Sequence, residues 1–158
     1  MSDKISTFLW FDNNAEEAIN LYISIFKNSK ILYLSRYPEG GAMPKGTLFT
    51  ATILLEGRKY NFINGGPHYK LNPSVSLFVS CETQEEIDLY WSKLSEGGEE
   101  LMCGWLTDAY GLSWQIIPEK LGDYIGNSNP AKAQNAMQAM FKMKKLNIAE
   151  LQKACDEA

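Results

Sequence analysis

The feature that most constrains the fold of this chain is a short sequence that occurs twice. Residues 16–22 read EEAINLY and residues 85–90 read EEIDLY, and the two match when one residue is deleted. Each copy follows an apolar segment and a short polar loop. Two copies within the first 118 residues indicate one strand–helix–strands module present twice, and are too few for a solenoid.

The first module is expected at about residues 1–66. Its helix is predicted over residues 15–26, capped by Asn13 or Asn14, because apolar residues recur there at helical spacing. Its strands are rich in β-branched and aromatic residues. They are expected at residues 5–11, 30–37, 47–55 and 59–64.

The second module is expected at about residues 74–118. It has a strand at 74–80, a helix capped by Thr83, and strands at 99–105 and 112–117. A helical extension, about residues 119–158, follows Pro118. Its segments are expected at residues 120–125, from Asn129–Pro130, and from Asn147 with Glu150.

Composition limits the function. The net charge is −4, and the one basic cluster, at residues 142–145, fits a solvated helix face, so no nucleic-acid binding is expected. No apolar run is long enough to span a membrane, and residues 1–5 do not resemble a signal peptide. Three widely spaced cysteines fit neither a disulfide framework nor a zinc site, so the cytoplasm is the expected location.

Several segments together resemble the PhnB-like family of the vicinal oxygen chelate superfamily, which includes glyoxalase I, bleomycin-resistance proteins and extradiol dioxygenases. They are residues 8–18 (FLWFDNNAEEA), 64–67 (NGGP), 103–106 (CGWL), 108–111 (DAYG), 113–116 (SWQI), 130–132 (PAK) and 140–145 (MFKMKK). The resemblance implies an α+β fold in which two βαβββ modules form curled mixed sheets with a cleft, followed by C-terminal helices. It implies a single vicinal oxygen chelate-type domain over residues 1–158, and a homodimer.

In metal-using relatives, strands of both modules supply ligands to a divalent ion. The corresponding places in this chain are Thr7, Asn64, Ser74 or Ser76, and Gln115. Hydroxyl and amide oxygens are weak ligands, so no tightly bound metal and no other cofactor are expected. Gln115 and Asn64 are the weak candidates if a metal is held at all, and His68 is interpreted as a loop residue.

The remaining candidates are residues expected to line a small-molecule cleft. Alternation places Thr7, Leu9 and Phe11 on one face of the first strand, and this face is expected to look into the cleft. The second module adds Cys103, Trp105, Ser113 and Gln115. Structural roles remain alternatives for these residues. Trp105 and Trp114 are also consistent with core positions, Gln115 with a hydrogen bond to a buried backbone group, and Cys103 with an inert buried thiol. Asp108 is expected to cap a turn in which Gly111 has positive φ.

These observations favour a small-molecule-binding homodimer of unknown ligand without a tightly bound metal. One alternative is a metal-dependent lyase, isomerase or dioxygenase that uses Gln115 and Asn64. Another is a resistance protein that sequesters a cationic drug. Family members are often described as demethylubiquinone methyltransferases, but Gly40–Gly41 and Gly65–Gly66 are interpreted as turns and not as a methyl-donor loop.

Overall fold

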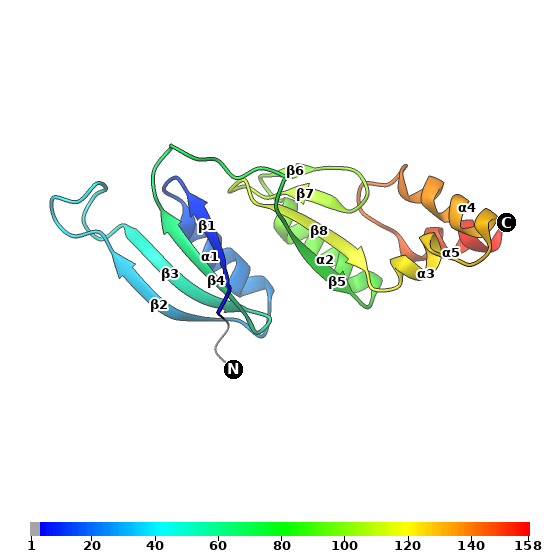
Figure 1. The fold of residues 1–158 in the computed structure, drawn as a ribbon, viewed down its shortest axis with the longest axis horizontal. Helices are drawn as coiled ribbons and strands as arrows, with labels where there is room; N and C mark the ends of the chain where they lie inside the picture. Colours follow the sequence, from blue (N-terminus) through cyan, green and yellow to red (C-terminus); the bar gives the residue numbers. More distant parts are fainter. Residues whose placement is uncertain (1–3) are drawn as a thin grey trace. The chain divides into compact units, whose positions relative to one another are not determined.

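The computed structural model describes residues 4–158, which divide into two compact units: the first extends to Leu71, and the second is Asn72–Ala158. Unit one contains β1 (Thr7–Phe11), α1 (Ala15–Ile25), β2 (Lys30–Arg36), β3 (Leu48–Leu55) and β4 (Arg58–Asn64) (Figure 1). Its sheet has the order β1-β4-β3-β2. The β1–β4 pair is parallel and the other pairs are antiparallel, so the sheet is mixed.

Unit two repeats this plan. Its module contains β5 (Ser76–Cys81), α2 (Gln84–Ser95), β6 (Glu99–Glu100), β7 (Trp105–Thr107) and β8 (Ser113–Pro118). The sheet order is β5-β8-β7-β6, with β5 and β8 parallel, which is the arrangement of unit one. The expected pair of βαβββ modules is confirmed.

The prediction of one continuous strand over residues 99–105 is wrong for the residues in the middle of that range. Only Glu99–Glu100 and Trp105–Thr107 are strands, and a turn separates them. Cys103 and Gly104 in this turn have φ of 60° and 81°, a left-handed conformation that interrupts a strand. Residue 104 must be glycine, because a Cβ there would lie 2.8 Å from the carbonyl oxygen of Ile116.

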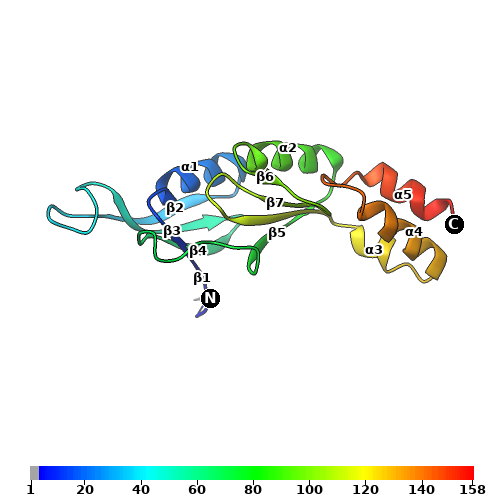
Figure 2. The ribbon, with the colours of Figure 1, turned by 90° about the horizontal axis from the view of Figure 1, so that it is seen from above.

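Each module places its helix on one face of its sheet (Figure 2). In unit one the rings of Phe11 and Phe62 stack 5.5 Å apart, and Tyr22 of α1 lies against Phe62. In unit two, Ile87, Trp91 and Leu94 of α2 are buried. We call the opposite side of each sheet its open face.

The helix starts agree only in part with expectation. Thr83 caps α2 by accepting a hydrogen bond from Glu86 N, as predicted. Asn129 and Asn147 cap the helices that follow them. The side-chain cap predicted for α1 at Asn13 or Asn14 is not formed. Asn14 occupies the N-cap position, but its side chain makes no hydrogen bond to the first turn of the helix.

The C-terminal extension forms α3 (Leu121–Ile125), α4 (Pro130–Met140) and α5 (Ile148–Asp156). These helices share a small core with the end of β8, made of Ile117, Tyr124, Ala136, Leu146, Leu151 and Cys155. Within residues 4–158, no helix has the length and apolar character needed to cross a membrane.

Candidate functional site

The open face of the unit two sheet brings together most of the candidate residues of the second module. Strand register places Trp105, Gln115 and Phe78 side by side across β7, β8 and β5. Residues paired in register point to the same face of a sheet, so Gln115 lies between two aromatic side chains.

The amide of Gln115 has one half engaged and the other half available. Its Nε2 donates a hydrogen bond to Ser76 Oγ at 2.9 Å. No described residue hydrogen-bonds to its Oε1. The side chain of Gln115 therefore makes no hydrogen bond to a buried backbone group within residues 4–158, and its carbonyl oxygen can accept a hydrogen bond from a ligand.

A pocket of about 320 Å³ opens beside Gln115, entirely within unit two. It is lined by Phe78, Ser80, Cys103, Trp105, Gln115, Ile117, Pro118, Glu119, Leu121, Gly122, Ile125 and Met140. Its volume is at the lower end of the roughly 300–1,000 Å³ typical of small-molecule sites. The structure thus brings Cys103, Trp105 and Gln115 to one pocket.

The neighbouring row of the same face consists of hydroxyl side chains. Thr107, Ser113 and Ser76 are paired in register across β7, β8 and β5. Ser113 is 1% exposed, and its Oγ has no hydrogen-bond partner among the described residues. A buried hydroxyl without a partner is uncommon, which makes Ser113 a polar group next to Gln115 that is still unsatisfied.

Cys103 lies in the turn before β7, and its Sγ lies 3.7 Å from the carbonyl oxygen of Met140. The turn is held by two backbone hydrogen bonds: Cys103 N donates to Met143 O, and Gly104 N donates to Lys144 O, both at 2.8 Å. The position of Cys103 in the pocket therefore depends on the C-terminal segment, a relationship with no signal in the sequence pattern.

Ser74 is not in the sheet. β5 begins at Ser76, and Ser74 lies in an exposed turn in which its N–H donates to Asn72 Oδ1. Of the two alternatives Ser74 and Ser76, the structure places Ser76 beside Gln115.

The candidates of β1 lie differently from expectation. Leu9 is 4% exposed and Phe11 is 2% exposed, and Phe11 packs on Phe62 under α1. The prediction that the Thr7, Leu9 and Phe11 face looks into an open cleft is therefore wrong. Phe8, which is 60% exposed, and half-buried Trp10 lie on the open face instead, because side chains alternate along β1 and Leu9 and Phe11 occupy the face that the helix covers.

Asn64 is a structural residue on the helix-covered side of unit one. It is 1% exposed; its Oδ1 accepts a hydrogen bond from Ala15 N at 2.9 Å, and its Nδ2 donates to Leu48 O at 3.0 Å. Both halves of the amide are engaged by backbone, so Asn64 does not fit the role of a metal ligand.

The open face of unit one carries a polar network that the sequence analysis missed. Asn61 of β4 donates to Ser6 Oγ and accepts from Thr52 Oγ1, while Ser35 and Thr50 share a hydrogen bond. Alternation in β3 and β4 is the signal that could have indicated it.

The donor set does not fit the divalent ion that the superfamily implies. Among residues 4–158 there is no group of three or more His, Cys, Asp or Glu side chains placed to hold a metal. Of the two weak candidates, Asn64 is engaged by backbone, which leaves the neutral amide of Gln115 as a single donor. Neutral amides are poor ligands for a tightly held divalent ion.

Asp108 shapes the loop between β7 and β8, as predicted. Its Oδ1 accepts hydrogen bonds from Tyr110 N and Leu112 N, and its Oδ2 accepts one from Trp114 Nε1 at 2.9 Å. Gly111 has a φ of 93°. Trp114 is buried in the core, whereas Trp105 is half-buried in the pocket wall, so the two tryptophans have different roles.

The model of the 3-demethylubiquinone-9 3-methyltransferase family matches residues 3–117. The solved structure of the PhnB protein from Bacillus cereus, which carries the same methyltransferase description, is 41% identical. Its TM-score is 0.70, and the match covers 73% of this chain and 99% of that one. This chain belongs to the PhnB-like family. Its expected membership is confirmed.

More distant solved structures share the fold of this PhnB-like protein. Protein PA1353 from Pseudomonas aeruginosa is 19% identical with a TM-score of 0.63, over 75% of this chain and 98% of that chain. The fosfomycin resistance protein FosX from Listeria monocytogenes is 16% identical with a TM-score of 0.51, over 72% and 88%. No curated protein sequence matches the chain.

Both glycine pairs of this PhnB-like protein lie outside helices and strands, but only Gly40–Gly41 belongs to a turn region; the turn after β4 is at Pro67–His68, so the turn predicted at Gly65–Gly66 is displaced. Gly40 and Gly41 lie in the loop between β2 and β3, and Gly65 and Gly66 follow β4. Neither pair joins a strand to a helix, so the methyl-donor loop described above is not formed at these positions.

Proposed function

We propose that this PhnB-like protein binds a small organic molecule in the pocket of unit two, as a cytoplasmic homodimer without a tightly bound metal ion. The observation that carries the proposal is the placement of Gln115 between Phe78 and Trp105 in that pocket. An apolar hollow with a few polar groups is the usual form of a small-molecule site.

The spacing of the strands suggests the shape of the ligand. Phe78 and Trp105 are two strands apart, so their backbones are about 10 Å apart. A flat ring can lie over Gln115, with Phe78 and Trp105 on either side, and a donor on that ring can reach Gln115 Oε1. We therefore favour a flat molecule that carries a hydroxyl or amine group.

The charge of the lining favours an uncharged or cationic ligand. Of the residues that the structure places in the pocket lining, Glu119 alone carries a charged side chain, and its carboxylate repels anions. This also gives a second candidate function, sequestration of a cationic compound, because aromatic faces attract cations.

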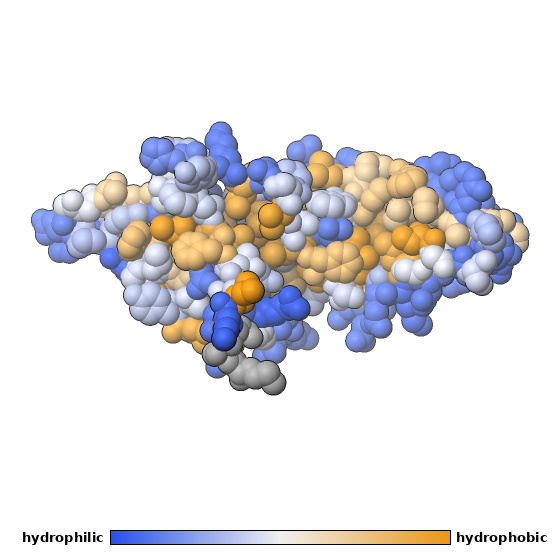
Figure 3. Space-filling model, in the orientation of Figure 1, coloured by the Kyte–Doolittle hydropathy of each residue, from blue (hydrophilic) through white to orange (hydrophobic). Residues whose placement is uncertain are grey.

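The homodimer is supported by exposed apolar side chains in unit one. Phe8 of β1 and Tyr33 of β2 are exposed on the open face, where hydrophobic residues are visible (Figure 3), and Ile31 and Leu32 of β2 are exposed as well. Exposed apolar patches commonly mark protein–protein contacts. Native mass spectrometry of the untreated protein tests this: a monomer at micromolar concentration contradicts the dimer, and a stoichiometric divalent ion contradicts the metal-free site.

Calorimetric titration with 4-ethylphenol tests the pocket. We expect a dissociation constant on the order of 0.1–1 mM, as for a fragment of this size. Trp105→Ala should weaken binding at least about ten-fold, and Gln115→Met, which keeps the shape but loses the acceptor, should weaken it about five-fold. Phe49→Ala, which removes an exposed aromatic ring of unit one, is the control and should bind normally. Absence of heat with the wild type, or unchanged binding by Trp105→Ala, contradicts the proposal.

A charged probe distinguishes the second candidate. Phenyltrimethylammonium should bind more tightly than 4-ethylphenol if the site is adapted to cations, and Glu119→Gln should weaken only the cation. Equal affinities that Glu119→Gln leaves unchanged would favour the neutral ligand.

A further inference from the structure

The far end of the pocket is built by residues outside the part of the chain that matches the family. The match ends at residue 117. Beyond it, Leu121, Gly122 and Ile125 of α3, which follows the end of β8, and Met140 of α4 line the same pocket as Trp105 and Gln115. Apart from Gly122, the side chains that these helices contribute are apolar, whereas Ser80, Gln115 and Glu119 provide polar atoms elsewhere in the lining.

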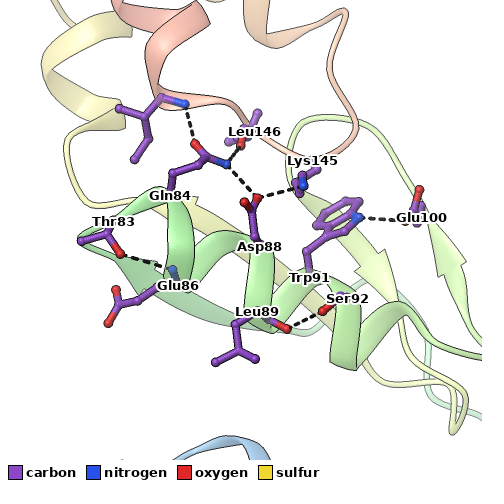
Figure 4. Close-up of polar contacts among 11 residues, drawn as sticks. Thr83, Gln84, Glu86, Asp88, Leu89, Trp91, Ser92, Glu100, Lys145 and Leu146 are labelled. Carbon is purple, nitrogen blue, oxygen red and sulfur yellow. Dashed lines mark hydrogen bonds and ion pairs between the residues drawn. The ribbon is translucent and has the colours of Figure 1, made fainter.

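The segment that connects α4 to α5 is fixed to the module by side chains of α2. Gln84 Oε1 accepts a hydrogen bond from Ile148 N, and its Nε2 donates to Leu146 O and to Asp88 Oδ1 (Figure 4). Asp88 also forms an ion pair with Lys145 at 2.8 Å (Figure 4). The same segment accepts the backbone hydrogen bonds of Cys103 and Gly104. It is therefore attached on two sides, and the helices it joins are held against the pocket.

We infer that the C-terminal helices are part of the ligand site and limit the length of the ligand. The ligand class is an uncharged molecule with a hydrogen-bonding ring between Phe78 and Trp105 and a short apolar tail directed toward α3 and α4. This inference rests on the proposed function, because it requires that the pocket binds a small molecule.

The apolar end of the pocket gives the expected dependence on tail length. Each methylene that becomes buried should tighten binding about four-fold. The gain must stop when the tail reaches α3 and α4, since the pocket volume is only about 320 Å³. A series of 4-n-alkylphenols, from ethyl to nonyl, should therefore pass through an optimum length.

Two substitutions should move this optimum in opposite directions. A Cβ added at Gly122 meets no atom within 4 Å, so Gly122→Phe can fill the pocket without a clash at Cβ. It should shorten the optimal tail by at least two methylenes. Met140→Ala removes a lining side chain and should lengthen the optimal tail by one or more methylenes. Met137→Ala makes the same change at an exposed position of the same helix and should leave the optimum unchanged.

Calorimetric titration of the wild type and the three variants with the alkylphenol series provides the test. Opposite shifts in Gly122→Phe and Met140→Ala, with no shift in Met137→Ala, support the inference. If the wild type binds the series and Trp105→Ala does not, but Gly122→Phe and Met140→Ala keep the wild-type optimum, the inference is wrong and the proposed function stands. If the wild type binds no member, both are overturned. Gly122→Ala shows whether any effect of Gly122→Phe comes from the helix backbone, because it should keep the wild-type optimum.

Discussion

The side-chain oxygen of Asn64 accepts a hydrogen bond from the backbone N–H of Ala15, the first residue of α1 and 49 positions earlier in the chain. The end of β4 thus caps the helix that follows β1. The adjacent Asn14, although it is the N-cap residue, makes no side-chain cap hydrogen bond. Because Asn64 also donates to Leu48 O, one buried amide joins α1, β3 and β4.

Replacing Asn64 should destabilise the protein strongly. Asn64→Ala removes the cap of α1 and leaves the carbonyl oxygen of Leu48 without its donor, so we expect the free energy of unfolding to fall by about 2–4 kcal/mol. Urea denaturation followed by circular dichroism measures this. Asn61→Ala, on the open side of the same strand, loses only exposed or half-buried hydrogen bonds; it is the matched control and should cost less, about 0.5–1.5 kcal/mol. Equal costs for the two variants would contradict the capping role.

Asp108 should be required as a carboxylate. Asp108→Asn places an NH₂ group against a donor, either the indole N–H of Trp114 or the backbone N–H groups of Tyr110 and Leu112. We expect a loss of about 2–3 kcal/mol and a change in the near-ultraviolet circular dichroism of the buried indole. Asp123→Asn on α3 is the control; a similar loss there would indicate a general charge effect.

The thiol of Cys81 should make stability decrease at alkaline pH. Burial, with the carboxylate of Glu86 adding to it, raises the pKa of Cys81 to about 12, whereas the thiol in the unfolded chain has a pKa of about 8.5. The folded protein holds this proton more tightly, so its stabilising effect is complete below about pH 8.5 and is lost as the pH rises toward 12.

Denaturation of the wild type and Cys81→Ala at several pH values measures this effect. Between about pH 9 and 12 the wild type should lose stability more steeply than the variant, by at most about 1.4 kcal/mol per pH unit. Parallel slopes for wild type and Cys81→Ala would show that the thiol does not contribute.

The unsatisfied hydroxyl of Ser113 predicts an unusual response to truncation. Ser113→Ala removes a buried oxygen that has no hydrogen-bond partner among the described residues, so the free energy of unfolding should stay constant or rise by up to about 1 kcal/mol. Ser76→Ala, in the same hydroxyl row, loses the bond to Gln115 and should cost about 0.5–1.5 kcal/mol. A clear destabilisation by Ser113→Ala would mean that a bound water or ligand satisfies the hydroxyl.

Local patterns were sufficient for most helices and strands. Thr83, Asn129 and Asn147 precede helices and cap them, because a cap bonds to backbone only two or three residues away. The strand at residues 99–105 was misjudged for a related reason: its β-like composition gives no sign that Cys103 adopts positive φ. That conformation is held by backbone atoms of Met143 and Lys144, 40 residues away.

The sequence by itself determined the duplicated βαβββ plan and the family, since these follow from short-range periodicity and from motifs. Only the tertiary structure decided which face of β1 is covered, because alternation separates two faces but does not say which one a helix packs against. It likewise decided that Asn64 caps a helix and that α3 and α4 line the pocket beside Gln115. Those relationships join residues far apart in the chain, and their free energy comes from burial and hydrogen bonds that form only after the elements have packed.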